Sequence, residues 1–466
     1  MIGNQKNVIF DTVLEVTKAL IEAWIQEKSL RIHEITLIRD VFGHVSVLIE
    51  SETSTHDGPD KAAISQADIA VLKEKLRSAL KEFFSGSIYH KPKADASDLE
   101  KQVIREIERL RYENQQFSSE QNIIWYLLER GFAKKAWLDQ GGRWEAVWKY
   151  DEACGGKEPK VVSFYSFKGG MGRTTALAAT AILLAKQGKS VLMVDTDIEA
   201  PGVADIFFDQ NTVQYGTVDF FVNYQALANY QADMQKYILE VTDATLKEDL
   251  SGELYVIPAG KTDESYLSKL ARIDYQDMIP DGMRDTVTRL MKDAVKFLEE
   301  HGKAIDYVLL DARAGFHDLG GVVTFQIPHG IVLVGRDNEQ SWTGIKQAVT
   351  LAGTTQKEPI PIVLLDSMCD VIPAFAMEQR DLFKKRAYTL CCDSYYPEEQ
   401  QPGPDAEDEA HTPVYIPYRQ ALNEEVQLYS DGSIKQDGAL REQKSVLCER
   451  EYQELLRRIE LWFGDT

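Results

Sequence analysis

Long hydrophobic runs are absent from this sequence. The first apolar stretch, from Val8 to Trp24, is interrupted by four charged side chains. No other run approaches the roughly 18 uninterrupted apolar residues that mark a membrane helix. We therefore expect neither a signal peptide nor a membrane span.

Cysteine and positive charge are also scarce. Five cysteines are spread over 466 residues without the spacing of a metal site or a disulfide framework. This usage indicates a reducing compartment, so we expect a cytoplasmic protein. Lys and Arg total 52 against 74 Asp and Glu, a net charge of -22. Because nucleic-acid binding needs a strong positive field, this balance argues against nucleic acid on the main surface.

The charge is unevenly distributed along the chain. Residues 1–150 hold 21 basic and 23 acidic side chains, a net of -2, and the remainder holds 31 and 51, a net of -20. The change coincides with a turn-rich stretch at residues 151–159, which predicts a linker there. We therefore expect a small α+β N-terminal domain over 1–150 and a larger domain over 160–466.

The N-terminal part shows mixed patterns. Apolar spacing predicts helices over 8–27, 64–84, 99–112 and 121–138. Two short β-type runs, 35–38 and 44–49, flank Gly43 and predict a hairpin. Four tryptophans gather before the linker, and large aromatic side chains of this kind favour a core position over an aromatic contact surface. They are Trp125, Trp137, Trp144 and Trp148.

From residue 160 the pattern changes to short apolar β-branched runs separated by helical stretches. Such alternation predicts an α/β fold with a mostly parallel, doubly wound sheet and helices on both faces. The runs are Val161–Phe164, Ser190–Val194, Leu254–Ile257, Tyr307–Leu310, Gly330–Val334, Ile360–Leu365 and Val414–Ile416. Residues 394–413 contain an acidic, proline-rich stretch that predicts a mobile loop. The alternative is an acidic segment that binds a basic partner.

The segment 161–176 reads as a strand, a glycine-rich loop and the start of a helix. Glycines let backbone N–H groups curl around phosphate oxygens, and a helix N-terminus adds partial positive charge. The hydroxyl of Thr174 is placed to bind Mg²⁺. The spacing departs from the usual G-x-x-x-x-G-K-[ST] pattern, because Phe167 stands at the first glycine and Arg173 at the lysine.

Two further strands end in carboxylates. Asp195 and Asp197 close the run 190–197, and Asp311 closes the run 304–311, with Gly315 shortly after it. Carboxylates at strand ends beside a phosphate loop can hold Mg²⁺ through water and orient an attacking water. Capping of the following helices is the alternative for each Asp alone. The three segments in this order favour a nucleotide site.

The motif at residues 168–175, KGGMGRTT, resembles the deviant Walker A motif K-G-G-x-G-K-[ST]-T of the ParA/MinD family. It is most similar to the branch with Arg in the motif, the KGGVGR ATPases. The similarity covers roughly residues 160–422, including the runs 256–259 and 416–418, and says nothing of residues 1–150. It implies a SIMIBI-class P-loop domain that uses ATP and Mg²⁺ and closes as a homodimer across two ATP molecules.

The resemblance also implies roles for individual residues. Lys168 would reach the partner protomer's phosphates, and Asp197 would position the hydrolytic water. Thr174 would bind Mg²⁺ directly and Asp311 through water, while Asp195 would support the site from behind. The nucleotide would further contact Gly169, Gly170, Met171, Gly172, Arg173, Thr175, Gly315 and Pro417.

Arg173 is the departure from the family motif. Arginine is longer than lysine, planar and bidentate, so the loop must accommodate a larger head group. It can still neutralise phosphate oxygens, and the intact acidic residues predict slow ATP hydrolysis.

Other polar residues near the strand ends carry weaker predictions. Arg313 either reaches phosphate or a partner, or forms a surface ion pair. Arg336 and His317 are interpreted as loop residues. Asp366 and Ser367 follow a late strand where the family often contacts adenine, although the family's usual Asn is missing there. Pro417 and Tyr418 flank the base or form a strand-end turn.

The C-terminal run 440–463 is amphipathic and mixes glutamates with its arginines. An anionic membrane would not attract it strongly, so docking on the domain is the favoured interpretation.

The preferred functional hypothesis is an ATP-dependent dimerisation switch that controls a partner protein through residues 1–150. From the systems in which proteins of this branch usually occur, the resemblance implies a bacterial antiphage or conflict system with the effector on another chain. Three alternatives stay open. They are a cargo-positioning or DNA-partitioning ATPase, a bacterial-type tyrosine kinase and a non-hydrolysing nucleotide-binding scaffold.

Overall fold

The computed structural model divides the chain into two compact units, Met1–Phe132 and Ala133–Thr466. The described residues are 8–30, 32–40, 42–51, 64–91, 98–111, 116–120, 123–129, 135–138, 146, 148, 158–227, 230–273, 282–353, 358–423, 425–430 and 434–464. The division falls earlier than the linker expected at 151–159, because residues 136–137 pack into the core of the second unit. Trp144 and most of the expected linker lie outside the described residues.

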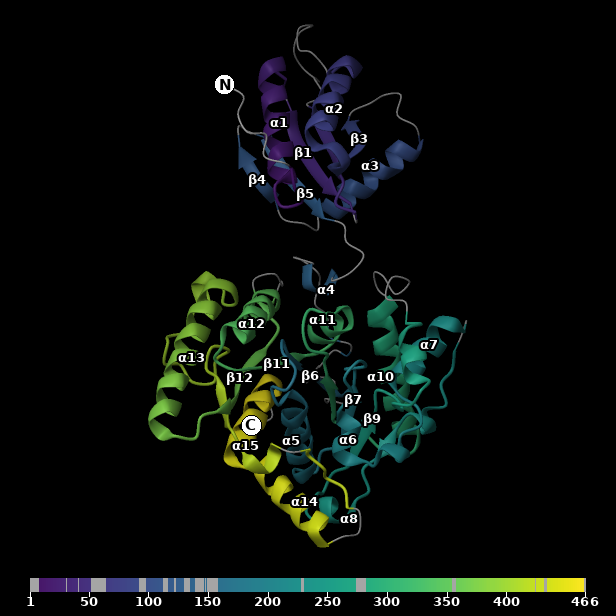
Figure 1. The fold of residues 1–466 in the computed structure, drawn as a ribbon, viewed down its shortest axis with the longest axis vertical. Coiled ribbons are helices and arrows are strands. Elements are labelled where there is room, and N and C mark those ends of the chain that lie inside the picture. The colour runs from purple at the N-terminus through teal and green to yellow at the C-terminus, as the bar shows by residue number, and fades with distance from the viewer. Residues whose placement is uncertain are drawn as a thin grey trace. The chain divides into compact units, whose positions relative to one another are not determined.

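The first unit contains a five-stranded sheet with the order β3-β2-β1-β5-β4 (Figure 1). Helices α1 and α2 cover one face through a shared apolar core, and α3 covers the other. The elements are α1 Val13–Lys28, β1 Ile32–Arg39, β2 Val45–Ser51, α2 Gln66–Leu80, β3 Phe84–Lys91, α3 Asp98–Arg111, β4 Gln116–Glu120 and β5 Ile123–Glu129.

The predicted hairpin around Gly43 is confirmed. Strands β1 and β2 pair antiparallel, and the Asp40 carboxylate accepts the backbone N–H groups of Phe42 and His44 at 2.9 and 2.8 Å. Gly43 has a φ of +86°, in the left-handed region that glycine adopts without strain. The turn chemistry visible in the sequence therefore forms this hairpin.

The helix predicted over 121–138 is wrong. Its first half is β5, which pairs with β1 and β4 inside the sheet, and its second half contains the short helix α4, Lys135–Leu138. The apolar run of β5 is rich in β-branched and aromatic side chains, and such a run cannot be assigned from periodicity alone. Trp125 on this strand is fully buried, as its predicted core position requires.

The second unit is built around an eight-stranded sheet with the order β13-β12-β11-β6-β10-β7-β9-β8. All neighbouring pairs run parallel except β8–β9. The strands are β6 Lys160–Ser166, β7 Val191–Asp195, β8 Leu239–Glu240, β9 Leu254–Ile257, β10 Tyr307–Asp311, β11 Gly330–Gly335, β12 Ile362–Cys369 and β13 Val414–Pro417. All seven predicted strands are present, and the α/β fold class is confirmed.

Helices cover both faces of this sheet. One apolar core joins the sheet to α10–α13, and the other joins it to α5, α6, α14 and α15. The helices are α5 Arg173–Lys186, α6 Val203–Phe207, α7 Thr217–Ala226, α8 Ala244–Lys247, α9 Tyr266–Leu270, α10 Gly282–Glu300, α11 Asp318–Phe325, α12 Glu339–Ala352, α13 Pro373–Ser394, α14 Ile434–Leu447 and α15 Arg450–Glu460. None of the described helices has the length and apolar character that crossing a membrane requires.

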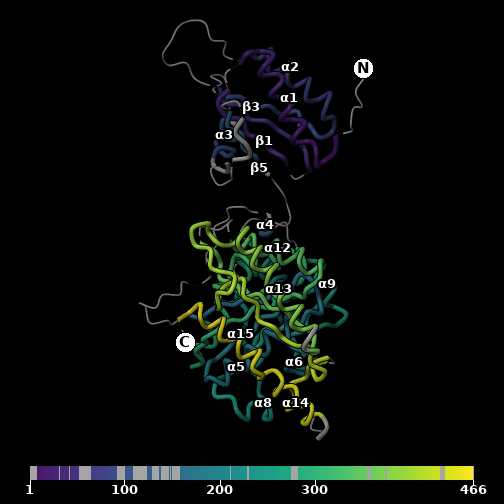
Figure 2. The backbone as a smooth tube through the Cα atoms, turned by 90° about the vertical axis from the view of Figure 1, so that its left-hand side faces the viewer, coloured from purple at the N-terminus to yellow at the C-terminus, as the bar shows by residue number. Residues whose placement is uncertain are grey.

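The C-terminal run docks on the domain, as its charge mixture indicated. It forms two helices rather than one, because the chain turns between Leu447 and Arg450. Leu455, Leu456 and Ile459 of α15 are buried in the same core as α5. α15 lies over α5 in Figure 1, and Figure 2 shows the two helices together from the side. The Ala-rich helix α5 is consequently buried between the sheet and this pair.

The acidic loop within 394–413 is anchored, which corrects the prediction of a mobile loop. His411 is fully buried and its Nδ1 lies 2.8 Å from the Tyr396 hydroxyl. Arg458 donates to the carbonyls of Thr412 and Glu409 at 3.0 and 2.6 Å. Local composition favoured mobility, and the contacts with α15 override it.

Candidate functional site

Three neighbouring strands bring the predicted site residues to one edge of the sheet. β10 lies between β6 and β7, and Asp311, its last residue, stands opposite Asp195 in the register of β7. β6 ends at Ser166 and leads directly into the glycine-rich loop. Ligands of open α/β sheets bind at this carboxyl edge, so the sequence order of the three segments becomes a spatial cluster.

The loop between Ser166 and α5 contains two glycines with left-handed backbone conformation. Gly170 and Gly172 have φ values of +71° and +73°, and Gly172 is the N-cap of α5. Lys168, Gly169 and Gly170 are exposed to solvent, whereas Met171 is buried. Left-handed glycines beside a helix N-terminus turn backbone N–H groups outward, which favours an anion.

Arg173, the residue that departs from the motif, points inward. Its Nε donates to Oδ1 of Asp311 at 2.6 Å, and its Nη2 donates to Oδ2 of Asp197 at 2.8 Å. The side chain is only 8% exposed, so the guanidinium is a buried counter-charge shared by two carboxylates. The planar fork of arginine permits this double contact, which the single ammonium of lysine does not reproduce.

The site contains oxygens of the kind that Mg²⁺ prefers. Thr174 Oγ1 donates to Oδ2 of Asp311 at 2.8 Å. Oδ1 of Asp197 and Nη1 of Arg173 are buried and have no hydrogen-bond partner among the described residues. No cluster of three metal-ligating side chains occurs in the described ranges. A magnesium ion would take the Thr174 hydroxyl directly and Asp311 through water, with phosphate and further water completing its shell, and the residues fit that arrangement.

Asp195 is fully buried and organises the loop that follows it. Its carboxylate accepts the backbone N–H groups of Asp197, Gly202 and Val203 at 3.0, 3.0 and 3.1 Å. Because α6 begins at Val203, the capping alternative holds for Asp195. Burial, assisted by the adjacent Asp311 carboxylate, raises the pKa of Asp195 to about 8 despite these donors. Asp311 instead contacts Arg173 and Thr174.

The loops after Asp197 and Asp311 are joined to each other. Arg313 forms an ion pair with Glu199, and Nε2 of His317 lies 3.5 Å from the same carboxylate. Arg313 thus forms an ion pair in this structure, and its contact with phosphate or a partner stays a prediction. Arg336 is exposed on its own loop. The sequence analysis did not single out Glu199 as a site residue. Its position two residues after Asp197 was the signal that could have identified it.

A small hollow of about 100 Å³ adjoins the phosphate loop. Gly172, Thr175 and Ala176 line it from the loop and α5, Ser367 and Met368 from the end of β12, and Pro417 and Tyr418 from the end of β13. The Ser367 hydroxyl donates to the carbonyl of Gly335, so it is already engaged by the backbone. Met368 has a φ of +53°, an uncommon value for a residue with a side chain. The site thus places Pro417 and Tyr418 beside Thr175.

Asp366 does not line this hollow, although the resemblance pointed to it. It is 3% exposed, and burial raises its pKa to about 7, with a further contribution from Asp337.

This elevated pKa predicts a pH-dependent stability. A carboxyl with a raised folded pKa stabilises the fold at low pH, and that contribution is lost as the pH rises through about 7. Between pH 5 and pH 8, Asp366→Asn should therefore gain free energy of unfolding relative to the wild type by about 2–3 kcal/mol, because about two pH units separate pH 5 from the folded pKa of about 7 and each contributes roughly 1.4 kcal/mol. Chemical denaturation at both pH values measures the difference. Asp393→Asn, an exposed change on α13, is the matched control, and parallel pH trends for both variants would contradict the assignment.

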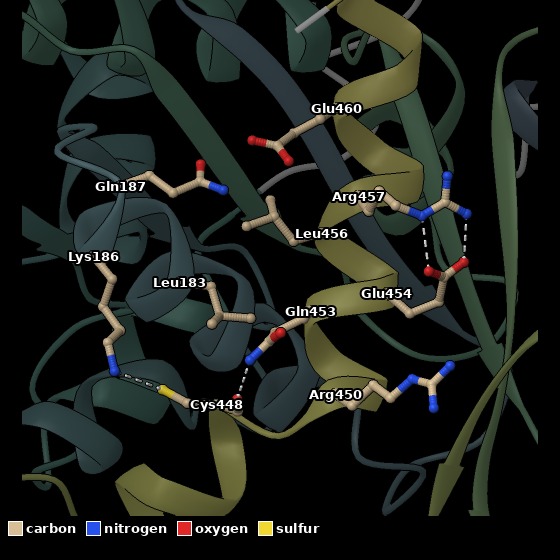
Figure 3. A pocket seen from close by; sticks show the side chains of 10 residues that line it. All are labelled: Leu183, Lys186, Gln187, Cys448, Arg450, Gln453, Glu454, Leu456, Arg457 and Glu460. Atoms are coloured by element: carbon tan, nitrogen blue, oxygen red, sulfur yellow. Dashed lines mark hydrogen bonds and ion pairs between the residues drawn. The ribbon is translucent and has the colours of Figure 1, made fainter. Parts of the chain in front are cut away.

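A second hollow, of about 550 Å³, lies between α5 and α15. Figure 3 shows Lys186 directed at Cys448, and Arg457 paired with Glu454 along α15. Lys186 also pairs with Asp249 at 2.7 Å and Arg457 with Asp408. Because these two basic groups are already neutralised, they offer no free charge to an anionic ligand.

Known proteins are similar to part of this chain. A family described as an AAA domain matches residues 159–314. An arsenical pump-driving ATPase 2 from Aquifex aeolicus is 28% identical over 165 residues, which are 34% of this chain and 47% of that protein. The tyrosine-protein kinase YwqD of Bacillus subtilis is 40% identical over 57 residues, 12% of this chain and 24% of the kinase. The chain thus spans less than half the length of either relative.

Among solved structures, the cell division ATPase MinD of Pyrococcus furiosus is 17% identical, with a TM-score of 0.37. The match covers 64% of this chain and all of that one.

Proposed function

We propose that the chain is an ATP-driven dimerisation switch built on a P-loop ATPase domain of the ParA/MinD type, in the part of the chain that the AAA-domain family matches, residues 159–314. It binds ATP with Mg²⁺, closes as a homodimer, hydrolyses the nucleotide slowly and thereby controls a partner protein. The observation that carries this proposal is the buried cluster of Arg173, Asp197 and Asp311 directly beneath an exposed glycine-rich loop.

In this proposal the phosphates of ATP lie in the loop 168–175 and the base enters the hollow beside Thr175 and Pro417. The exposed glycine N–H groups and the N-terminus of α5 neutralise the phosphate oxygens. Lys168 is exposed at the start of the loop, where it is free to extend toward a second protomer.

Hydrolysis requires a water molecule aligned with the γ-phosphorus. Asp197 is suited to orient that water, because Arg173 fixes one of its oxygens and the other is buried without a partner among the described residues. Thr174 and Asp311 would hold the magnesium ion, which supplies charge neutralisation to the phosphates when bound. Arg173 holds both carboxylates through Nε and Nη2, so only its buried Nη1 is left for a phosphate, and a fuller contact requires that the double contact loosen. We infer that this requirement slows turnover.

The partner protein would act through the N-terminal unit, and the setting we propose is a bacterial antiphage or conflict system. The proposal of this setting rests only on the resemblance of the motif 168–175. The DNA-partitioning alternative is disfavoured by the net charge of -20 over residues 151–466. The tyrosine-kinase alternative has limited support, since only Tyr418, Tyr429 and Tyr452 lie in the last fifty residues, well separated.

The test is the mass of the full chain in solution with and without ATP and Mg²⁺, with phosphate release read from the same samples. We expect an ATP-dependent dimer in the wild type. Thr174→Ala should abolish it, because the variant loses the hydroxyl that would bind magnesium and that now donates to Asp311. Thr389→Ala, which removes an exposed hydroxyl on α13, is the matched control. A mass indifferent to ATP, with no bound nucleotide, would refute the switch.

A further inference from the structure

The first helix of the second unit reaches the loop that follows Asp311. Helix α4 begins three residues after the first unit ends at Phe132, and it lies against α11 (Figure 1). Trp137 on α4 is 3% exposed. A Cβ atom on Gly321 of α11 would lie 2.6 Å from its Nε1, so only glycine permits this approach. The position of the indole is therefore fixed by close packing.

Two side-chain donors hold carbonyls of the loop 312–317. The indole N–H of Trp137 donates to the carbonyl of His317 at 2.7 Å. The hydroxyl of Tyr165, on β6, donates to the carbonyl of Gly315 at 3.3 Å. Gly315 has a φ of +76°, so the loop turns sharply between the two contacts. The same loop follows Asp311 and carries Gly315, one of the residues that the resemblance places against the nucleotide.

Aromatic contacts continue from Trp137 to the phosphate loop. The rings of Trp137 and Phe316 are 5.0 Å apart, edge to face, and those of Phe316 and Phe167 are 4.8 Å apart. Phe167 immediately precedes Lys168, and a Cβ atom on Gly344 would lie 2.1 Å from the Cβ of Phe167. Three rings thus join α4, the loop after Asp311 and the start of the phosphate loop. Aromatic pairs at these separations contribute on the order of 1 kcal/mol each beyond their burial.

We propose that Trp137 is a positioning residue that restrains the loop 312–317 against movement toward the γ-phosphate, and so couples the chain entering from the N-terminal unit to the nucleotide. This inference rests on the proposed function. A γ-phosphate that draws Gly315 inward must break the contact of Trp137 with His317. By linkage, a displacement of α4 that breaks the same contact makes ATP binding more favourable. ADP lacks the γ-phosphate, so its binding does not require the contact between Trp137 and His317 to break.

The test compares ATP and ADP affinities of the full chain by titration calorimetry. Trp137→Phe keeps an aromatic ring and removes the donor, and it should strengthen ATP binding about 3- to 10-fold, the equivalent of one hydrogen bond. Its ADP affinity should equal that of the wild type. Tyr165→Phe removes the second donor and should act in the same direction, which preserves the test if Trp137→Phe does not fold.

Trp342→Phe is the matched control, because its buried indole N–H also donates a hydrogen bond, to Asp337 at 2.8 Å, away from this loop. It should leave both affinities unchanged. An equal shift for ATP and ADP in Trp137→Phe, no shift, or weaker ATP binding would overturn the coupling. If the wild type binds no ATP, the proposed function itself fails, and that outcome is distinct from the others.

Discussion

Arg173→Ala should lower the free energy of unfolding by about 3–5 kcal/mol, because it leaves two buried carboxylates without their shared counter-charge. Asp311 is fully buried and Asp197 is 5% exposed, so water cannot replace the guanidinium. ATP binding should weaken as well, since the carboxylates would then face the phosphates without a neutralising partner. Denaturant unfolding and nucleotide titration of the same variant measure both effects.

Two further variants make the result specific. Arg457→Ala removes an arginine that also contacts two carboxylates, Glu454 and Asp408, but on the surface at 42% exposure. Its expected cost is below about 1 kcal/mol. Arg173→Lys retains the charge but not the fork, and should be intermediate in stability. If Arg173→Ala and Arg457→Ala lower the free energy of unfolding by the same amount, the buried ion pairs of Arg173 contribute no more to stability than the surface pairs of Arg457.

Asp197→Asn should reduce phosphate release about 100-fold or more while ATP binding persists. A positioned carboxylate contributes on the order of 10²–10⁴ to proton transfer from an attacking water. The amide loses that basicity but has nearly the same shape. Single-turnover phosphate release measures the loss, and the ATP-dependent dimer should live longer than in the wild type because its nucleotide is consumed more slowly.

Asp209→Asn is the control for this experiment, because its exposed carboxylate lies in the following loop and caps Asn211. It should release phosphate at the wild-type rate. Undiminished turnover in Asp197→Asn would remove Asp197 from the hydrolytic step. The water would then have to be oriented by another group, and Glu199 is the nearest candidate along the chain.

The sequence predicted the second unit far better than the first. Parallel strands buried on both faces appear as continuous apolar runs, and all seven were recognised from local composition. The small sheet of the first unit offered weaker signals. Its strand β3, FSGSIYHK, has too few apolar residues to be recognised, and β5 was assigned to a helix because a short apolar run fits either element.

The candidate site was likewise predicted from the sequence only in part. The order of the glycine-rich loop, Asp195, Asp197 and Asp311 along the sequence determined which groups would meet, because parallel strands present their carboxyl ends at one edge. The sequence alone did not determine the direction of Arg173, which was expected to face phosphate. Only the packed structure, in which two carboxylates converge on one buried position, turns its guanidinium inward. Burial makes that pairing decisive, since an unpaired charge there would cost several kcal/mol.

Trp137 is the clearest case of what only the tertiary structure decided. Its size and apolar character predicted a core position, and it is buried. Its partners are the carbonyl of His317 and the ring of Phe316, about 180 residues further along the chain. Local patterns determine which side chains leave water and which strands form. The choice of contacts across such separations depends on how close two elements can approach, and here the missing side chain of Gly321 sets that distance.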